Sequence, residues 1–125
     1  MESILEKAIR RPITPEEIET FPKPDYVTSV EMSSEEVTAV CPVTGQPDWY
    51  RVAIRYTPNS VCLESKSLKL YLWGFRDKGE FCEALASRIA QELFDVLKPG
   101  HIMVELRQRP RGGVGITARA ERSAS

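Results

Sequence analysis

Cys41 and Asp48 stand seven positions apart, at the two ends of the stretch Cys-Pro-Val-Thr-Gly-Gln-Pro-Asp. Proline fixes φ and glycine accepts φ values that other residues avoid, so this stretch is expected to form a shaped loop. A cysteine on a rigid loop, with a carboxylate at the far end, could be a nucleophile with its proton donor. The alternative is a buried cysteine and a turn-forming aspartate, because unpaired cysteines are commonly core residues.

Three further groups could bind a polar or charged ligand. Lys66 and Lys69 lie three positions apart in a predicted helix, so both could reach one phosphate-bearing group, or they could form a solvated face. Glu83, near the start of the next predicted helix, could grip the N–H edge of a guanine-like ring or simply stabilise the helix N-terminus. Arg111 lies in a Pro-Arg-Gly-Gly connection, where it could bind an anion or be solvated.

The composition is that of one globular domain. The chain has 125 residues, of which 42% are hydrophobic and 28% charged, and a net charge of −1 gives no argument for a large nucleic-acid surface. Three cysteines without a Cys-x-x-Cys pair, and His101 as the one histidine, argue against a zinc site or a disulfide framework. No apolar run is long enough to span a membrane and no signal-peptide core is apparent, so we expect a cytoplasmic location.

The hydrophobic patterns predict an α+β domain of ββααββ order, preceded by an arm over residues 1–25 that carries a short helix starting at Thr14. The domain is expected over residues 26–118, and a disordered tail over 119–125. The predicted strands cover 26–32, 49–57, 102–106 and 114–118, a turn covers 33–36, and the helices cover 65–76 and 80–97. This order implies a four-stranded antiparallel sheet with both helices on one face. Its open edges could pair between subunits in a ring.

Together these groups resemble the short, single-module 7-cyano-7-deazaguanine reductases, the QueF-type nitrile reductases of queuosine biosynthesis. The resemblance spans residues 26–116 and rests on four stretches, namely CPxTGQPD at 41–48, ESKSLKLY at 64–71, GxFxE at 79–83 and PRGG at 110–113. It implies the tunnelling fold (T-fold), with rings that are commonly two stacked pentamers and active sites between subunits.

The resemblance also implies a mechanism. Cys41 falls on the nucleophile that forms a covalent thioimide with the nitrile, and Asp48 falls on the proton donor. NADPH then reduces the nitrile to the aminomethyl group in two steps, with the free base as substrate and no direct contact with nucleic acid. The substrate-binding positions are Leu63, Glu64, Ser65, Cys82 and Glu83, and the NADPH-binding positions are Lys66, Lys69 and Arg111. Cys82 stands where the family usually has a histidine.

Two other functions stay open. An amidine-forming transferase of the same fold, similar to archaeosine synthase, would keep the pair Cys41 and Asp48 but add ammonia. The intact ESKSLKLY stretch argues against it, because this stretch carries the expected NADPH-binding lysines and a transferase needs no NADPH. A ring that binds a purine or pterin without turnover is the second alternative, and Cys82 in place of histidine is its support.

Overall fold

The computed structural model describes residues 9–125, so the first eight residues of the expected arm lie outside it. The elements are a 3-10 turn η1 (Pro15–Glu17), strands β1 (Thr20–Pro22), β2 (Val30–Val40), β3 (Pro47–Thr57) and β4 (Val61–Leu63), helices α2 (Ser65–Trp73) and α3 (Cys82–Leu97), and strands β5 (His101–Arg111) and β6 (Val114–Ser123). Among the described residues, no helix is long and apolar enough to cross a membrane.

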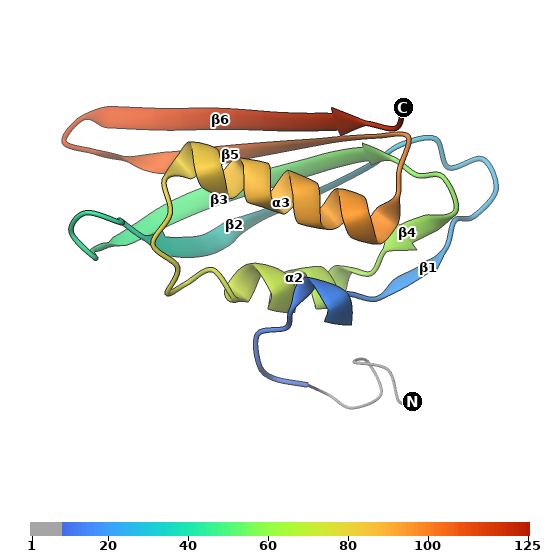
Figure 1. The fold of residues 1–125 in the computed structure, drawn as a ribbon, viewed down its shortest axis with the longest axis horizontal. Coiled ribbons are helices and arrows are strands. Elements are labelled where there is room, and N and C mark those ends of the chain that lie inside the picture. Colours follow the sequence, from blue (N-terminus) through green and yellow to red (C-terminus); the bar gives the residue numbers. More distant parts are fainter. Residues whose placement is uncertain (1–8) are drawn as a thin grey trace.

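The main sheet is antiparallel, with strand order β2-β3-β5-β6. Both helices lie on the same face of it, where α3 packs on β5 and β6 and α2 contacts β2 (Figure 1). The predicted arrangement of an antiparallel sheet under two helices is therefore confirmed. A second sheet of two short strands, β1 and β4, was not predicted, because three-residue strands that include Pro22 carry no alternating pattern.

The core forms where the alternating face of β3 meets the apolar stripe of α3. Tyr50, Val52, Ile54 and Tyr56 are all buried, as the period of two predicts for one face of a strand. Leu85, Ile89 and Leu93 of α3 are spaced four apart and are fully buried above this face. This packing fixes α3 on the sheet, and with it the position of the first turn of α3.

The first predicted strand was placed too early. Tyr26 is 98% exposed with φ +72, and β2 begins only at Val30. The turn predicted over 33–36 is also wrong, because these residues belong to β2. A register shift between Ser34 and Val37 accommodates the extra residues as a β-bulge, so the strand continues through a polar stretch that resembles a turn in sequence.

The disordered tail predicted from residue 119 is wrong as well. β6 continues to Ser123, which pairs with His101 at the start of β5. Arg119 Nε donates to Glu105 Oε2 across the two strands at 2.8 Å. Cross-strand pairing therefore orders a segment whose small and charged side chains gave no hydrophobic signal. The helices are close to prediction, with α2 three residues shorter than expected and α3 starting at Cys82.

Candidate active site

Three segments far apart in sequence meet at one end of the molecule. They are the β2–β3 connection that carries Cys41, the β5–β6 connection that carries Arg111, and the first turn of α3. Figure 1 shows all three at the end opposite β1 and β4. The segment before α3 is held there by backbone pairing, because Val40 N–H donates to Lys78 O at 2.9 Å and Val40 forms a bridge with Gly79. The strand order therefore creates the site that the local sequence motifs only suggested.

The loop after Cys41 is closed by its own backbone. Cys41 N–H donates to Gln46 O, and Gly45 N–H donates to Cys41 O, both at 2.8 Å. Gly45 has φ +73, a conformation that other residues adopt only with strain. The loop is thus shaped as the sequence predicted, and Cys41 remains partly exposed at its start.

The Cys41 thiol has a pKa below its ordinary value. The main cause is a hydrogen bond from the Thr44 side chain, followed by the backbone N–H groups of Thr44 and Val43, while burial and the negative charge of Asp48 oppose the shift. Donors that point at a sulfur favour the thiolate, which is the nucleophilic form of cysteine. Cys62 and Cys82 are buried, so Cys41 is the accessible thiol of the described residues.

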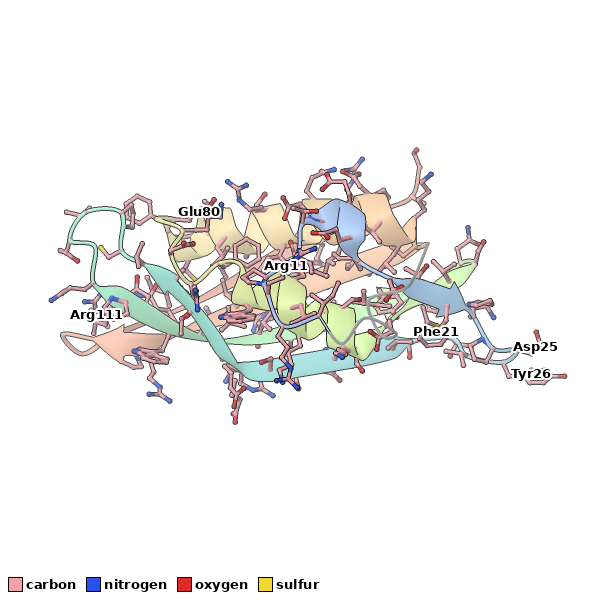
Figure 2. The ribbon with its side chains drawn as sticks, turned by 90° about the horizontal axis from the view of Figure 1, so that it is seen from below. Arg11, Phe21, Asp25, Tyr26, Glu80 and Arg111 are labelled. Carbon is pink, nitrogen blue, oxygen red and sulfur yellow. The ribbon has the colours of Figure 1, made fainter. Side chains whose placement is uncertain are left out.

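Asp48 is 5% exposed and is paired with Arg111. Arg111 Nη1 lies 2.5 Å from Asp48 Oδ1, and Nη2 donates to the Gln46 side chain at 2.5 Å. The two glycines after Arg111 have φ +59 and +82, which permits the tight turn that brings this strand end back to the Cys41 loop. Arg111 therefore lies at the carboxylate, at the end of the molecule marked in Figure 2.

Cys82 and Glu83 occupy the first turn of α3 but face different surroundings. Cys82 is 1% exposed, its sulfur lies 3.6 Å from Leu106 O as a weak donor, and burial, followed by the charge of Glu83, raises its pKa to about 11. Cys82 is thus a small core residue in this chain. Glu83 is exposed to solvent.

The other three predicted substrate-binding residues, Leu63, Glu64 and Ser65, lie at the opposite end of the folded molecule. Leu63 N–H donates to Tyr56 Oη at 2.8 Å, and the eight residue steps along β3 from Asp48 to Tyr56 span roughly 26 Å. Glu64 caps α2, since its carboxylate accepts the N–H groups of Lys66 and Ser67, each at 2.8 Å. Ser65 is exposed as the first residue of α2. One chain alone therefore divides the predicted substrate contacts into two separate groups.

Lys66 and Lys69 line a cavity of about 540 Å³ between α2 and β2. Its other walls include Arg10, Thr38, Leu72 and Trp73. The cavity combines cationic side chains, which suit phosphate groups, with an indole that can stack on an aromatic ring. These residues fit a dinucleotide such as NADPH. Arg111 contacts Asp48 and Gln46 and does not line this cavity.

Sequence reasoning missed Tyr50, which is 2% exposed. Burial raises its pKa most strongly, and the negative charge of Asp48 raises it further. The alternation of β3 could have identified it, because Tyr50 is the next inward position after Asp48. No three His, Cys, Asp or Glu side chains gather as a possible metal site within residues 9–125.

Comparisons with known proteins identify the family of the chain. The family model described as QueF-like protein matches residues 47–125. Two proteins named NADPH-dependent 7-cyano-7-deazaguanine reductase are among the relatives. The one from Anaeromyxobacter sp. (strain Fw109-5) is 46% identical over 107 residues, covering 82% of this chain and 88% of its own. The one from Nitrosospira multiformis is 42% identical over 108 residues, covering 83% and 76%.

A solved structure shows the same fold. The crystal structure of the archaeosine synthase QueF-Like in the apo form superposes with a TM-score of 0.75. It covers 81% of this chain and 99% of its own, at 20% sequence identity. The expected tunnelling fold is therefore confirmed for the single chain.

Proposed function

Because this chain belongs to the QueF-like family, we propose that it reduces the nitrile of 7-cyano-7-deazaguanine to the aminomethyl group with NADPH. Its relatives at 40–46% identity carry the name of that reductase. The product, 7-aminomethyl-7-deazaguanine, is a free base on the way to the queuosine modification of tRNA. The protein is thus an oxidoreductase that acts on a small molecule.

The observation that carries the proposal is the activated thiol of Cys41. Hydrogen bonds from the Thr44 side chain and the loop backbone lower the pKa of Cys41 and favour its thiolate. The thiolate adds to the nitrile carbon, so that a C–S bond forms while one of the C–N π bonds breaks. The product of this step is a thioimide, which is more easily reduced than a nitrile because its carbon is more electrophilic once the nitrogen is protonated.

Asp48 transfers the proton in this step. Its charge acts on Cys41, and its buried carboxylate forms an ion pair with Arg111. A carboxylate accepts protons and hydrogen bonds, so Asp48 takes the proton that the thiol releases and passes it to the substrate nitrogen. Glu83, in the first turn of α3, would accept hydrogen bonds from the N–H edge of the deazaguanine ring.

The cavity between α2 and β2 is the proposed site for NADPH. Lys66 and Lys69 would hold its phosphate groups, and Trp73 would offer a surface for one of its rings. When bound, NADPH supplies the hydride for each of the two reductions. The protein's own contribution is to hold the phosphates, while Cys41 retains the carbon that accepts the first hydride.

The active site is proposed to form between subunits. The β2–β3 connection and the first turn of α3, which carry Cys41, Asp48 and Glu83, lie at one end of the molecule, whereas β4, which leads into Glu64 and Ser65, lies at the other (Figure 1). A head-to-tail ring would bring one copy's first group to its neighbour's second group. Strands β2 and β6 are the sheet edges available for this pairing, and two stacked pentamers are the expected assembly. Sedimentation equilibrium tests this proposal, and a monomer at assay concentration would contradict it.

Intact-mass analysis without NADPH tests the proposed chemistry. The protein mixed with 7-cyano-7-deazaguanine is expected to gain the mass of one nitrile molecule per chain, and Cys41→Ala is expected to gain none. Cys62→Ala is the matched control, because Cys62 is buried beside β1 and should leave the adduct unchanged. An adduct that persists in Cys41→Ala would remove Cys41 from the proposed mechanism.

A further inference from the structure

The Tyr50 hydroxyl is a buried polar group without a partner. Only two buried side-chain oxygen or nitrogen atoms of the described residues lack a hydrogen bond, and they are Tyr50 Oη and Glu80 Oε2. A hydroxyl that is removed from water and left unpaired destabilises a fold, so such groups usually have a partner. The missing partner is either a water molecule or a ligand that binds at this point.

Strand register places Tyr50 at the end of the sheet that carries the candidate active site. Tyr50 shares the inward face of β3 with Asp48 and lies opposite Gln108 of β5. Leu106, two residues before Gln108, is the residue whose carbonyl contacts the Cys82 sulfur. Tyr50 therefore lies on the buried face of the sheet, at the end of β3 that carries Asp48 and the Cys41 loop.

Two other polar groups at this end, on Asp48 and Cys82, already have partners. Asp48 is in an ion pair with Arg111, and the Cys82 thiol is directed at Leu106 O. The pKa of Tyr50 is raised by burial and by the neighbouring negative charges, so the hydroxyl keeps its proton and can act as a donor. The Tyr50 hydroxyl is thus a buried hydrogen-bond donor for which the described residues provide no acceptor.

Attack on a nitrile needs a donor of this kind. As the Cys41 sulfur adds to the nitrile carbon, negative charge develops on the nitrogen, and a preorganised hydrogen bond to that nitrogen lowers the barrier. The geometry points to Tyr50 as this donor, so we infer that its hydroxyl binds the substrate nitrogen during thioimide formation. The inference rests on the proposed function. The nitrogen takes up the one proton released by the Cys41 thiol, through Asp48, so Tyr50 has no net loss of a proton.

Tyr50→Phe tests the inference, because it removes the hydroxyl and keeps the ring. The rate of Cys41 adduct formation with 7-cyano-7-deazaguanine is measured by intact mass, without NADPH. We expect the rate to fall roughly 10- to 100-fold. The melting temperature is expected to stay equal or rise, since an unpaired buried hydroxyl is lost.

Tyr71→Phe is the matched control. Tyr71 is equally buried, but its hydroxyl donates to Glu92 Oε1 at 2.6 Å, away from Cys41. This variant should lose stability and keep the adduct rate. Alkylation of Cys41 by iodoacetamide is a second control, and its pH dependence should be the same in Tyr50→Phe as in the wild-type protein. A shifted alkylation profile would mean that Tyr50 acts on the thiol, which overturns its assignment to the substrate nitrogen.

The outcomes separate the two claims. A wild-type protein that forms the adduct, with Tyr50→Phe forming it at the same rate, overturns the role of Tyr50 and leaves the proposed function intact. A wild-type protein that forms no adduct overturns both. A slow Tyr50→Phe variant with normal stability and normal alkylation supports the inference.

Discussion

Arg111 Nη1 lies 2.5 Å from Asp48 Oδ1, so the turn between β5 and β6 is joined to the Cys41 loop by an ion pair between an exposed arginine and a buried carboxylate. The two residues are 63 positions apart in the chain. Arg111 was expected to bind NADPH with Lys66 and Lys69, but its described contacts are with Asp48 and Gln46. Its proposed role is therefore to hold the carboxylate that moves the proton.

Arg111→Gln should slow adduct formation at Cys41 by roughly 10-fold, because a buried carboxylate that loses its partner changes position or takes up a proton. The KM for NADPH should stay within about twofold of the wild-type value. Arg109→Gln is the control, since Arg109 is an exposed arginine on the same strand. A raised KM for NADPH with a normal adduct rate would show that Arg111 binds NADPH and does not position Asp48.

Thr44→Val should raise the pKa of Cys41, because the Thr44 side chain is the largest cause of the lowered value. A higher pKa leaves less thiolate at neutral pH, so alkylation by iodoacetamide should be slower at pH 7 and reach half its maximum rate at a higher pH. Thr117→Val, on the exposed face of β6, provides the comparison. Superimposable pH profiles for the two variants would refute the role of Thr44.

Cys82→His should destabilise the fold by about 1–3 kcal/mol, because the larger, polar ring must fit a site that is 1% exposed. Ser87→His, on the exposed side of the same helix, should change the free energy of unfolding by less than about 0.5 kcal/mol. Urea unfolding of both variants measures this difference. Equal stability would show that position 82 opens toward the site and is not part of the core.

Lys66→Ala combined with Lys69→Ala should raise the KM for NADPH by roughly 10-fold or more, since two cations near phosphate groups are lost. The rate of adduct formation without NADPH should not change, because the lysines lie on α2, away from Cys41. Lys23→Ala with Lys98→Ala removes the same charge elsewhere. If this control pair raised KM equally, the cavity between α2 and β2 would not be the cofactor site.

The fold was predictable where hydrophobic periodicity is strong. The strict alternation in β3 and the stripe of Leu85, Ile89 and Leu93 in α3 each gave the right element and the right buried face. Prediction failed where polar residues form strands. The bulge after Ser34 and the end of β6 at Ser123 are held by pairing with neighbouring strands, which no local pattern records.

The shape of the Cys41 loop was predictable from the sequence, but the contacts between site residues on different strands were not. The prolines and Gly45 indicated a shaped turn around Cys41, and the structure has it. The contact of Arg111 with Asp48, the burial of Cys82 and the position of Tyr50 all depend on strand order and register. Glu64 illustrates the same limit, because its carboxylate caps α2 in this chain while its predicted contact is with the substrate.

NADPH oxidation with and without 7-cyano-7-deazaguanine tests the proposed function most directly. We predict oxidation that depends on the nitrile, with two NADPH consumed for each aminomethyl product formed, and no oxidation by Cys41→Ala. Nitrile-dependent adduct formation without any NADPH oxidation would contradict the reductase and favour the amidine-forming transferase of the same fold.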